Sequence, residues 1–270
     1  MNGYLVVKLG GTTVASQTTV LAEIASVARE RAVVVVHGGG SQVTEWLARL
    51  GQPTRFEDGL RVTDEASMEV VTAVLRGSVN TALVAALRGL GVDAVGLSGV
   101  DGGLLVGERL PGRGLVATVA SVRRALIDAL VADGRVAVVA PLACDEIGTV
   151  CNVNADDAAA GLARGLAAEL LVLLTDTDGV RGDDGARIPW LAAGHVETLI
   201  EAGTIDGGMA PKVRAALAAV SDGDATSVVI ADGGMPRVLE RAMAGDDIGT
   251  RIVADAAAQP AAATAREHVS

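Results

Sequence analysis

The chain has 270 residues, of which 50% are hydrophobic and 1% aromatic, and its formal net charge at pH 7 is −11. This length and apolar content predict a folded globular protein rather than a disordered chain. The acidity and the scarcity of aromatic rings disfavour a nucleic-acid partner, because phosphate-backbone binding needs Lys and Arg and unpaired bases stack on aromatic side chains. An anionic ligand would have to be held by local groups against the overall charge.

The cysteines and the hydropathy pattern narrow the cellular setting. Cys144 and Cys151 are too few for a disulfide scaffold and form no C-x-x-C metal motif. The N-terminus lacks the basic segment and apolar run of a signal peptide, and no uninterrupted apolar stretch approaches the roughly 20 residues of a membrane helix. We therefore expect a cytoplasmic protein without a membrane or nucleic-acid partner.

Short runs of β-branched residues and leucine alternate with longer helical segments along the chain. The expected strands are apolar throughout, as in a sheet covered on both faces, and comprise 5–9, 33–36, 94–97, 136–140, 170–174 and 228–230. The expected helices are 20–31, 41–50, 64–90, 122–133, 155–167 and 212–221. Such alternation predicts an α/β fold with a mainly parallel central sheet.

Two segments break this alternation, and a boundary and a tail follow them along the chain. Residues 52–62 and 102–118 carry Gly, Pro and charged side chains, so we expect hairpins or flaps projecting from strand ends, with 102–118 serving as a substrate lid. A softer boundary at 175–184 divides the chain into two lobes with a cleft between them. The Ala-rich segment 256–270 is expected to be a mobile tail.

Lysine is almost absent from this chain. Of its 22 basic residues only Lys8 and Lys212 are lysines, and both lie beside paired glycines. A lysine ammonium is a compact point charge, whereas arginine presents a planar fork. The two lysines are therefore candidates for binding a phosphate-like group, although both could also be ordinary surface residues.

Glycine-rich loops follow the first two expected strands, at 10–11 and 38–40. Glycines let backbone N–H groups approach an anion closely, and a following helix N-terminus adds a favourable dipole. Tight turns between strands and helices also need glycine for steric reasons, so these loops alone are ambiguous. Neither the Walker A pattern nor G-x-G-x-x-G is present, so a phosphate site here would be of another kind.

A polar constellation precedes the helix expected at 155–167. Asn152, Asn154 and Asp156 alternate, which directs them to one side of an extended segment, whereas helix capping would explain only one or two of them. Asp156 could hold both lysine ammonium groups in place. Asp176 lies in an acidic turn suited to nucleotide hydroxyl contacts or to capping.

Taken in order, these motifs resemble the amino acid kinase family, and within it the branch that acts on N-acetyl-L-glutamate. The matching segments are 7–11, 36–40, 59–64, 152–156, 174–176 and 207–209 followed by Lys212, with 248–250 near the end. The resemblance implies an open three-layer αβα sandwich with two lobes. Residues 1–174 would bind the amino acid and form the dimer contact, and residues 175–255 would bind ATP.

The resemblance also implies a reaction and its residues. ATP with Mg²⁺ would phosphorylate the side-chain carboxylate of N-acetyl-L-glutamate, giving an acyl phosphate on the route to arginine. The implied catalytic residues are Lys8, Lys212 and Asp156; the substrate-binding residues are Gly39, Gly40, Arg61, Asn152 and Asn154; the phosphoryl- and ATP-binding residues are Gly10, Gly11, Asp176, Gly208 and Met209. No protein metal site is implied, because Mg²⁺ arrives with ATP.

This reaction agrees with the chemistry of the residues. A carboxylate is already a nucleophile at neutral pH, so phosphoryl transfer needs positioning and positive charge rather than a general base. We therefore expect a structural role for His37. The residues implied for this chemistry are retained, although Ser41 stands where many relatives have proline and Thr81 stands where lysine is common.

Several alternatives stay open at this point. The chain starts at its first strand without the N-terminal helix of the hexameric, arginine-inhibited branch, so a homodimer insensitive to arginine is expected. A sister kinase acting on carrier-bound aminoadipate or glutamate is the nearest rival. A catalytically silent nucleotide or amino-acid sensor on the same fold is a further one.

Overall fold

The computed structural model describes residues 3–10, 18–220 and 227–254. Gly11 and the segment 256–270, which the sequence analysis singled out, lie outside the described residues. In chain order the elements are β1 (Leu5–Leu9), α1 (Thr18–Val27), β2 (Val33–His37), α2 (Gly40–Arg49), β3 (Arg55–Glu57), β4 (Leu60–Val62), α3 (Glu65–Thr72), η2 (Ala73–Val79), α4 (Asn80–Gly89), β5 (Ala94–Ser98), η3 (Asp101–Gly103), β6 (Leu105–Arg109), β7 (Val116–Val122), α5 (Ala125–Ala132), β8 (Val136–Ala140), β9 (Leu142–Cys144), β10 (Val150–Val153), α6 (Ala155–Gly165), β11 (Leu170–Thr175), β12 (Trp190–Ala192), η4 (Ala193–His195), α7 (Val196–Glu201), α8 (Met209–Val220), β13 (Ser227–Asp232), α9 (Val238–Ala244) and β14 (Thr250–Val253).

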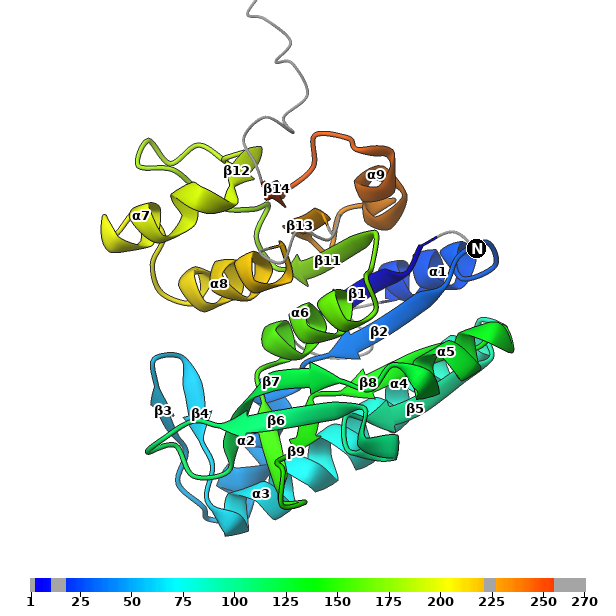
Figure 1. The fold of residues 1–270 in the computed structure, drawn as a ribbon, viewed down its shortest axis with the longest axis vertical. Coiled ribbons are helices and arrows are strands. Elements are labelled where there is room, and N and C mark those ends of the chain that lie inside the picture. Colours follow the sequence, from blue (N-terminus) through cyan, green and yellow to red (C-terminus); the bar gives the residue numbers. More distant parts are fainter. Residues whose placement is uncertain (1–2, 11–17, 221–226, 255–270) are drawn as a thin grey trace, which may run out of the picture.

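One eight-stranded sheet runs through the molecule in the order β12-β14-β13-β11-β1-β2-β8-β5 (Figure 1). Along this order, every pairing from β13 through β11, β1, β2 and β8 to β5 is parallel. On its other side β13 pairs with β14 in antiparallel orientation. The first strand lies in the interior of this sheet, with Leu5 opposite Leu170 on one side and Val33 on the other. The predicted fold class, with a mainly parallel central sheet, is confirmed.

Both faces of the sheet are apolar and covered, which explains the uninterrupted apolar runs in the sequence. Because successive strand residues point to opposite faces, Leu5 and Val7 of β1 fall on different faces from Val6. Leu5 and Val7 belong to a buried cluster with side chains of α1, α4 and α9. Val6 belongs to a second cluster with side chains of α5, α6 and α8. The sheet is therefore the middle of three layers.

A smaller, closed barrel of β10, β7, β6 and β9 lies beside the main sheet. The two segments expected as hairpins both form antiparallel pairs, β3 with β4 and β6 with β7. The first is exposed and projects, as Figure 1 shows. The second does not project, because Leu105, Val116 and Ala117 are buried in the barrel and its core. The strands of 102–118 therefore belong to the barrel rather than to a projecting flap, and a lid role for the more exposed turn between them stays a prediction.

The helix predicted at 64–90 is present as a continuous helical segment from Glu65 to Gly89 whose middle, η2, is π-helical. Its length and a mean hydropathy of 1.6 over 18 residues would suffice to cross a membrane, but Arg76 and Asn80 interrupt its apolar run, so the expectation that no uninterrupted apolar stretch has this length is not contradicted. Here it is a core helix of the α/β fold, because Leu83 and Leu87 are buried against the sheet and Asn80, a polar residue, is fully enclosed.

The C-terminal part is less regular than the sequence pattern suggested. Strands β12 and β14 and helices α7 and α9 were not predicted, because each is three to seven residues long and shows no clear periodicity. Helix α8 begins at Met209, one turn before the predicted start at Lys212. Helix α5 begins at Ala125 rather than residue 122, because Val122 closes β7.

Helix α6 packs against β7 through glycine. A Cβ added at Gly161 would lie 2.7 Å from Cγ1 of Val119, and one at Gly165 would lie 2.5 Å from Cβ of Val122. These contacts involve a short, branched side chain that cannot swing away. The small residues of α6 therefore allow the barrel to approach the helix that carries Asp156.

This packing predicts opposite effects for the same substitution at two helical glycines. Gly161→Ala should lower the free energy of unfolding by about 1–3 kcal/mol because it overpacks the contact with Val119. Gly89→Ala, on an exposed turn of α4 with nothing within 4 Å of the new Cβ, should raise it by up to about 1 kcal/mol. Urea unfolding of the two variants measures this, and equal shifts of the same sign would contradict the packing described.

Candidate active site

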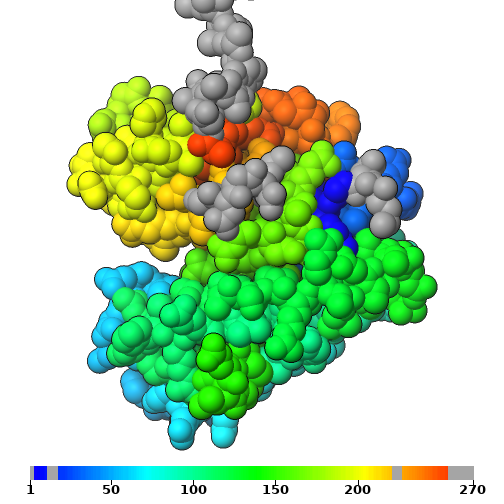
Figure 2. All heavy atoms as spheres, in the orientation of Figure 1, coloured from blue at the N-terminus to red at the C-terminus, as the bar shows by residue number. Residues whose placement is uncertain are grey.

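The carboxyl ends of the parallel strands form the floor of a cleft. Ligands of open α/β sheets bind at this edge, between strands whose connections leave in opposite directions. The cleft is lined by Lys8 near the end of β1, by Gly38–Gly40 after β2, and by Asn152–Asp156 at the end of β10 and the start of α6. Figure 2 shows a notch at its mouth, between the blue residues of β3–β4 and the yellow residues of α7–α8.

The two lysines meet at one carboxylate. Lys212 Nζ donates a hydrogen bond to Asp156 Oδ2 at 2.8 Å, and Lys8 Nζ lies 2.9 Å from Asp156 Oδ1. Each oxygen of the carboxylate therefore faces one ammonium group. The three side chains are only 9–13% exposed. The site therefore contains two buried ammonium groups and one carboxylate.

Burial and mutual charge determine the protonation of this triad. Burial lowers the pKa of Lys8, Lys212 lowers it further, and the Asp156 carboxylate opposes both effects. Burial alone would raise the pKa of Asp156, but the neighbouring ammonium groups outweigh it and hold that pKa below its usual range. Burial, reinforced by the charge of Asp156, raises the pKa of the adjacent Asp157 to about 6. Asp156 is therefore ionised at neutral pH.

Glycine is required at two positions in the cleft because of close contacts. A Cβ at Gly10 would collide with the backbone oxygen of Leu174 and would lie 3.2 Å from Lys8 Nζ. Gly39 has a φ of +152°, and a Cβ there would lie 2.5 Å from Leu75 Cδ2. The backbone at both glycines therefore approaches closer to its surroundings than any side chain would permit.

Arg61 points a buried cation into the same cleft. It is 7% exposed and donates to the Gly40 backbone oxygen at 2.8 Å and to Thr44 Oγ1 at 2.7 Å. Its guanidinium also lies 4.8 Å from the ring centre of Phe56. None of the ion pairs in the described residues gives Arg61 a carboxylate partner, and burial lowers its pKa. A buried cation without a counter-ion favours an anionic ligand.

The asparagines serve the fold as well as the cleft. Asn154 Oδ1 accepts from the backbone N–H of Asp156 at 2.8 Å, so this residue is the N-cap of α6. Asn152 Nδ2 donates to Thr63 Oγ1 at 3.3 Å. Both residues line the cleft together with Asp156, as their alternation predicted. Capping and cleft lining therefore coexist at Asn154.

The predicted nucleotide residues lie on the other side of the triad. Gly208 and Met209 form the turn and first residue of α8, one turn before Lys212. Asp176 follows β11, is exposed, and accepts from Thr175 Oγ1 at 3.1 Å. A methyl group added at Gly59 would lie 3.7 Å from Pro211 Cγ, so the tip of the β3–β4 hairpin lies against the start of α8.

Sequence reasoning overlooked the residues that support the site. Thr44 anchors Arg61, and Phe56, the single phenylalanine of the chain, stacks on it. The isolated Phe56 in a hairpin expected to be functional was an available signal. Asn80, a polar residue in an apolar helix, was another, because such a residue is buried only with partners. Nothing in the sequence singled out Thr44.

Comparisons with known proteins agree with this arrangement. The model of the amino acid kinase family matches residues 3–232. An acetylglutamate kinase of Rubrobacter xylanophilus is 45% identical over 249 residues, which are 92% of this chain and 96% of that protein. A Solibacter usitatus acetylglutamate kinase is 43% identical, with 92% of this chain and 98% of that protein covered.

Solved structures show the same fold. A crystal structure of a Streptococcus mutans UA159 protein matches with a TM-score of 0.80 and 27% identity, covering 94% of this chain and 100% of that one. N-acetylglutamate synthase of Neisseria gonorrhoeae, complexed with coenzyme A and N-acetyl-glutamate, has a TM-score of 0.80 and 25% identity over 94% of this chain and 60% of that one. The chain belongs to the amino acid kinase family.

Proposed function

We propose that this protein is an acetylglutamate kinase, which transfers the γ-phosphoryl group of ATP to the side-chain carboxylate of N-acetyl-L-glutamate. The observation that carries the proposal is the pairing of two buried lysines on Asp156 at the edge of a glycine-lined cleft. Transfer between two anions needs concentrated positive charge, and this site supplies it in a protein with a net charge of −11. The relatives named acetylglutamate kinase match nearly the whole chain.

Each member of the triad has a distinct part in the transfer. Lys8 lies on the side of the cleft lined by Gly38–Gly40, so its ammonium meets the phosphoryl group as it moves. Lys212, on α8, stabilises the charge that develops on the leaving nucleotide. Asp156 orients both, and because an ammonium group has three N–H donors, those of Lys8 that are not directed at Asp156 remain available to the phosphoryl oxygens.

The amino-acid substrate would occupy the part of the cleft near Arg61. A guanidinium binds a carboxylate in bidentate fashion, and Arg61 has no carboxylate partner among the described residues. The α-carboxylate of N-acetyl-L-glutamate is the counter-ion we assign to it. We assign the acetamido group to Asn152 and Asn154, and we assign Gly39 and Gly40 to substrate binding as well, because all four residues line the same cleft.

ATP would bind through the part of the chain after β11. We assign ATP binding to Asp176, Gly208 and Met209, and to Gly10 after β1; the same assignment for Gly11, which lies outside the described residues, stays a prediction. In the described residues no cluster of three His, Cys, Asp or Glu side chains could hold a metal ion. We therefore assign Mg²⁺ to the phosphates of ATP, where it neutralises their charge. A homodimer, a cytoplasmic location and the division of the chain at residue 174 also stay predictions.

Trapping the product with hydroxylamine tests the proposed function. An acyl phosphate reacts with hydroxylamine to a hydroxamate, which gives a coloured complex with Fe³⁺, so the purified protein should form this product from MgATP and N-acetyl-L-glutamate. Free glutamate and N-acetyl-aminoadipate, assayed in parallel, should give much less. If N-acetyl-L-glutamate gives no product, the assignment is wrong and carrier-bound substrates become the better explanation.

Lys8→Arg should fold but lose most of its activity. The planar guanidinium keeps the charge but cannot occupy the position of the compact ammonium between Asp156 and Gly10. We expect kcat in the hydroxamate assay to fall by about 100-fold or more. Arg88→Lys, an exposed exchange on α4, is the control and should leave kcat unchanged. Turnover of Lys8→Arg close to that of the wild type would refute the role of Lys8.

Arg61→Lys should act mainly on substrate binding. Lysine keeps the positive charge but loses the bidentate contact, so the KM for N-acetyl-L-glutamate should rise by about 10-fold or more, with a smaller effect on kcat and on the KM for ATP. Steady-state kinetics with each substrate varied in turn separates these effects. A change confined to the KM for ATP would place Arg61 in the wrong subsite.

Asp156→Asn should destabilise the fold at pH 7, because it leaves two buried ammonium groups without a counter-ion. We expect a loss of about 3–5 kcal/mol in the free energy of unfolding. Asp93→Asn is a matched control, since Asp93 also pairs with two cations, Arg88 at 2.7 Å and Arg135 at 3.0 Å, but on the surface. Its effect should be far smaller.

The same comparison can be repeated at different pH values. The lowered pKa of Asp156 means that its contribution to stability is present above the usual aspartate range and disappears as the pH falls through the native pKa. The difference between wild type and Asp156→Asn should therefore shrink on acidification. A difference that grows as the pH falls below 4 would contradict the charge assignment.

A further inference from the structure

Two contacts hold Gly38: one to its N–H, which belongs to the preceding His37–Gly38 peptide, and one to its oxygen, which belongs to the Gly38–Gly39 peptide. Gly38 N–H donates to the Leu9 backbone oxygen at 3.0 Å, and the Gly38 backbone oxygen lies 2.7 Å from His37 Nδ1. Because the peptide is planar and trans, the N–H of Gly39 points opposite to the Gly38 oxygen. Gly39 N–H has no hydrogen-bond partner in the described part of the chain, and Gly39 lines the cleft with Lys8.

The partners of His37 determine which ring nitrogen carries the proton. A backbone oxygen can only accept, so Nδ1 must be the donor to Gly38. On the other side of the ring, Nε2 lies 3.1 Å from Asn80 Nδ2, which can only donate. His37 is therefore neutral with its hydrogen on Nδ1. Burial lowers its pKa to about 4, the Gly38 hydrogen bond opposes this shift, and Arg76 adds to it, which agrees with a neutral ring.

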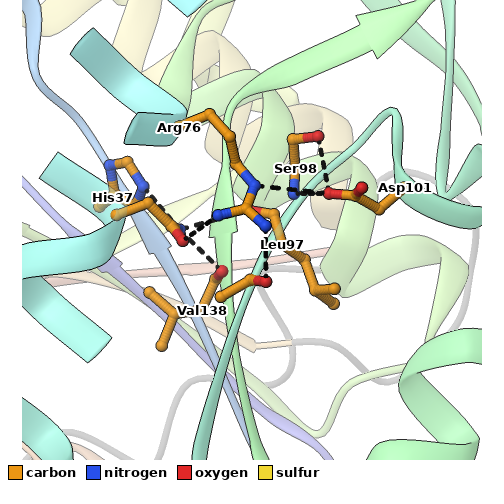
Figure 3. A network of polar contacts seen from close by, with 8 residues as sticks. His37, Arg76, Leu97, Ser98, Asp101 and Val138 are labelled. Atoms are coloured by element: carbon orange, nitrogen blue, oxygen red, sulfur yellow. Dashed lines mark hydrogen bonds and ion pairs between the residues drawn. The ribbon is translucent and has the colours of Figure 1, made fainter. Parts of the chain in front are cut away.

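Asn80 is oriented in turn by groups that allow only one arrangement of its amide. Its Nδ2 donates to the backbone oxygen of Val138 at 2.9 Å and is 3.3 Å from that of Leu97, while its Oδ1 accepts from Arg76 NH1 at 3.2 Å. Figure 3 shows these contacts converging between His37 and Arg76. Asn80 is fully buried, so an amide turned the other way would leave several polar groups unsatisfied.

The outer end of the network lies at the carboxyl end of β5. Arg76 NH2 donates to the Gly96 backbone oxygen at 3.1 Å, and its Nε lies 3.6 Å from Asp101 Oδ2. Ser98 anchors Asp101 through its backbone N–H and its hydroxyl (Figure 3). Arg76 lies in the π-helical segment η2, as does Leu75, which packs on Gly39. Segment η2 therefore supports the glycine loop through both polar and apolar contacts.

We propose that His37 is a positioning residue for phosphoryl transfer: held as the Nδ1–H tautomer by Asn80, it fixes the Gly38–Gly39 peptide and thereby aims the Gly39 N–H at the phosphoryl group. This inference rests on the proposed function and extends it from the residues lining the cleft to a buried network behind them. A purely structural histidine would affect stability, whereas a positioning histidine affects kcat through the donor to Gly38.

Two substitutions of His37 isolate this hydrogen bond. His37→Asn places an amide Nδ2 where the ring has Nδ1, so it can still donate to Gly38, whereas His37→Ala cannot. Both variants remove the acceptor for Asn80, so they differ chiefly in the Gly38 donor. We expect His37→Ala to lower kcat in the hydroxamate assay by about 100-fold and His37→Asn by less than about 10-fold, with both KM values changed by less than about 3-fold. Exposed His195→Ala is the control and should retain wild-type kcat.

The tautomer is measured separately, by ¹⁵N NMR of the imidazole nitrogens at pH 7 without substrates. The chain has three histidines, and His37→Asn identifies the signal of His37. The expected result is a protonated Nδ1 and an unprotonated Nε2. An Nε2–H tautomer or an imidazolium would overturn the inference, as would equal kcat values for His37→Ala and His37→Asn in folded protein.

The design separates this inference from the function on which it rests. If His37→Ala does not fold, a loss of about 100-fold in folded His37→Asn still overturns the inference, and activity within about 10-fold of wild type supports it. If the wild-type protein forms no hydroxamate, the proposed function fails, and the NMR spectrum reports on the His37 network independently.

Discussion

The structure depends on a single carboxylate that lies between two lysines. Asp156 holds Lys8 from β1 and Lys212 from α8 within 2.9 Å, in a protein whose other cations are arginines. Removing three charges from water is costly, and their mutual attraction offsets that cost only while all three are present. The local excess of one positive charge is what an acidic protein needs to attract the phosphates of ATP. The geometry of the remaining elements follows from keeping these groups together.

Several features of the fold serve this arrangement. Asn154 caps α6 and so fixes the first turn, where Asp156 lies. Gly161 allows the same helix to approach β7, and Gly10 leaves space between Leu174 and the ammonium of Lys8. The parallel sheet places the ends of β1 and β2 side by side, which brings the lysine and the loop at Gly38–Gly40 to the same edge. The small residues Gly10 and Gly161 thus allow the close packing that brings Lys8 and Asp156 together.

The sequence predicted the regular parts of the fold and the members of the site. Strands β1 and β8 were predicted to the residue because strands covered on both faces read as unbroken apolar runs, and Asp156 was paired with both lysines before any geometry was known. Closure of the barrel could not be predicted, because it depends on pairings between segments distant in sequence. For the same reason the strands of 102–118 were misinterpreted as a projecting flap. Thr44 and Asn80 could not be assigned their partners, which become neighbours only in the folded chain.

The scarcity of lysine makes the central claim directly measurable. With ¹⁵N-labelled lysine, the protein should give only two side-chain Nζ signals, from Lys8 and Lys212. A non-hydrolysable ATP analogue added with Mg²⁺ and N-acetyl-L-glutamate should shift both signals, because both ammonium groups contact the phosphate chain. If the ligands bind and leave either signal unchanged, the two lysines do not act together on the transferred group, and the account is contradicted.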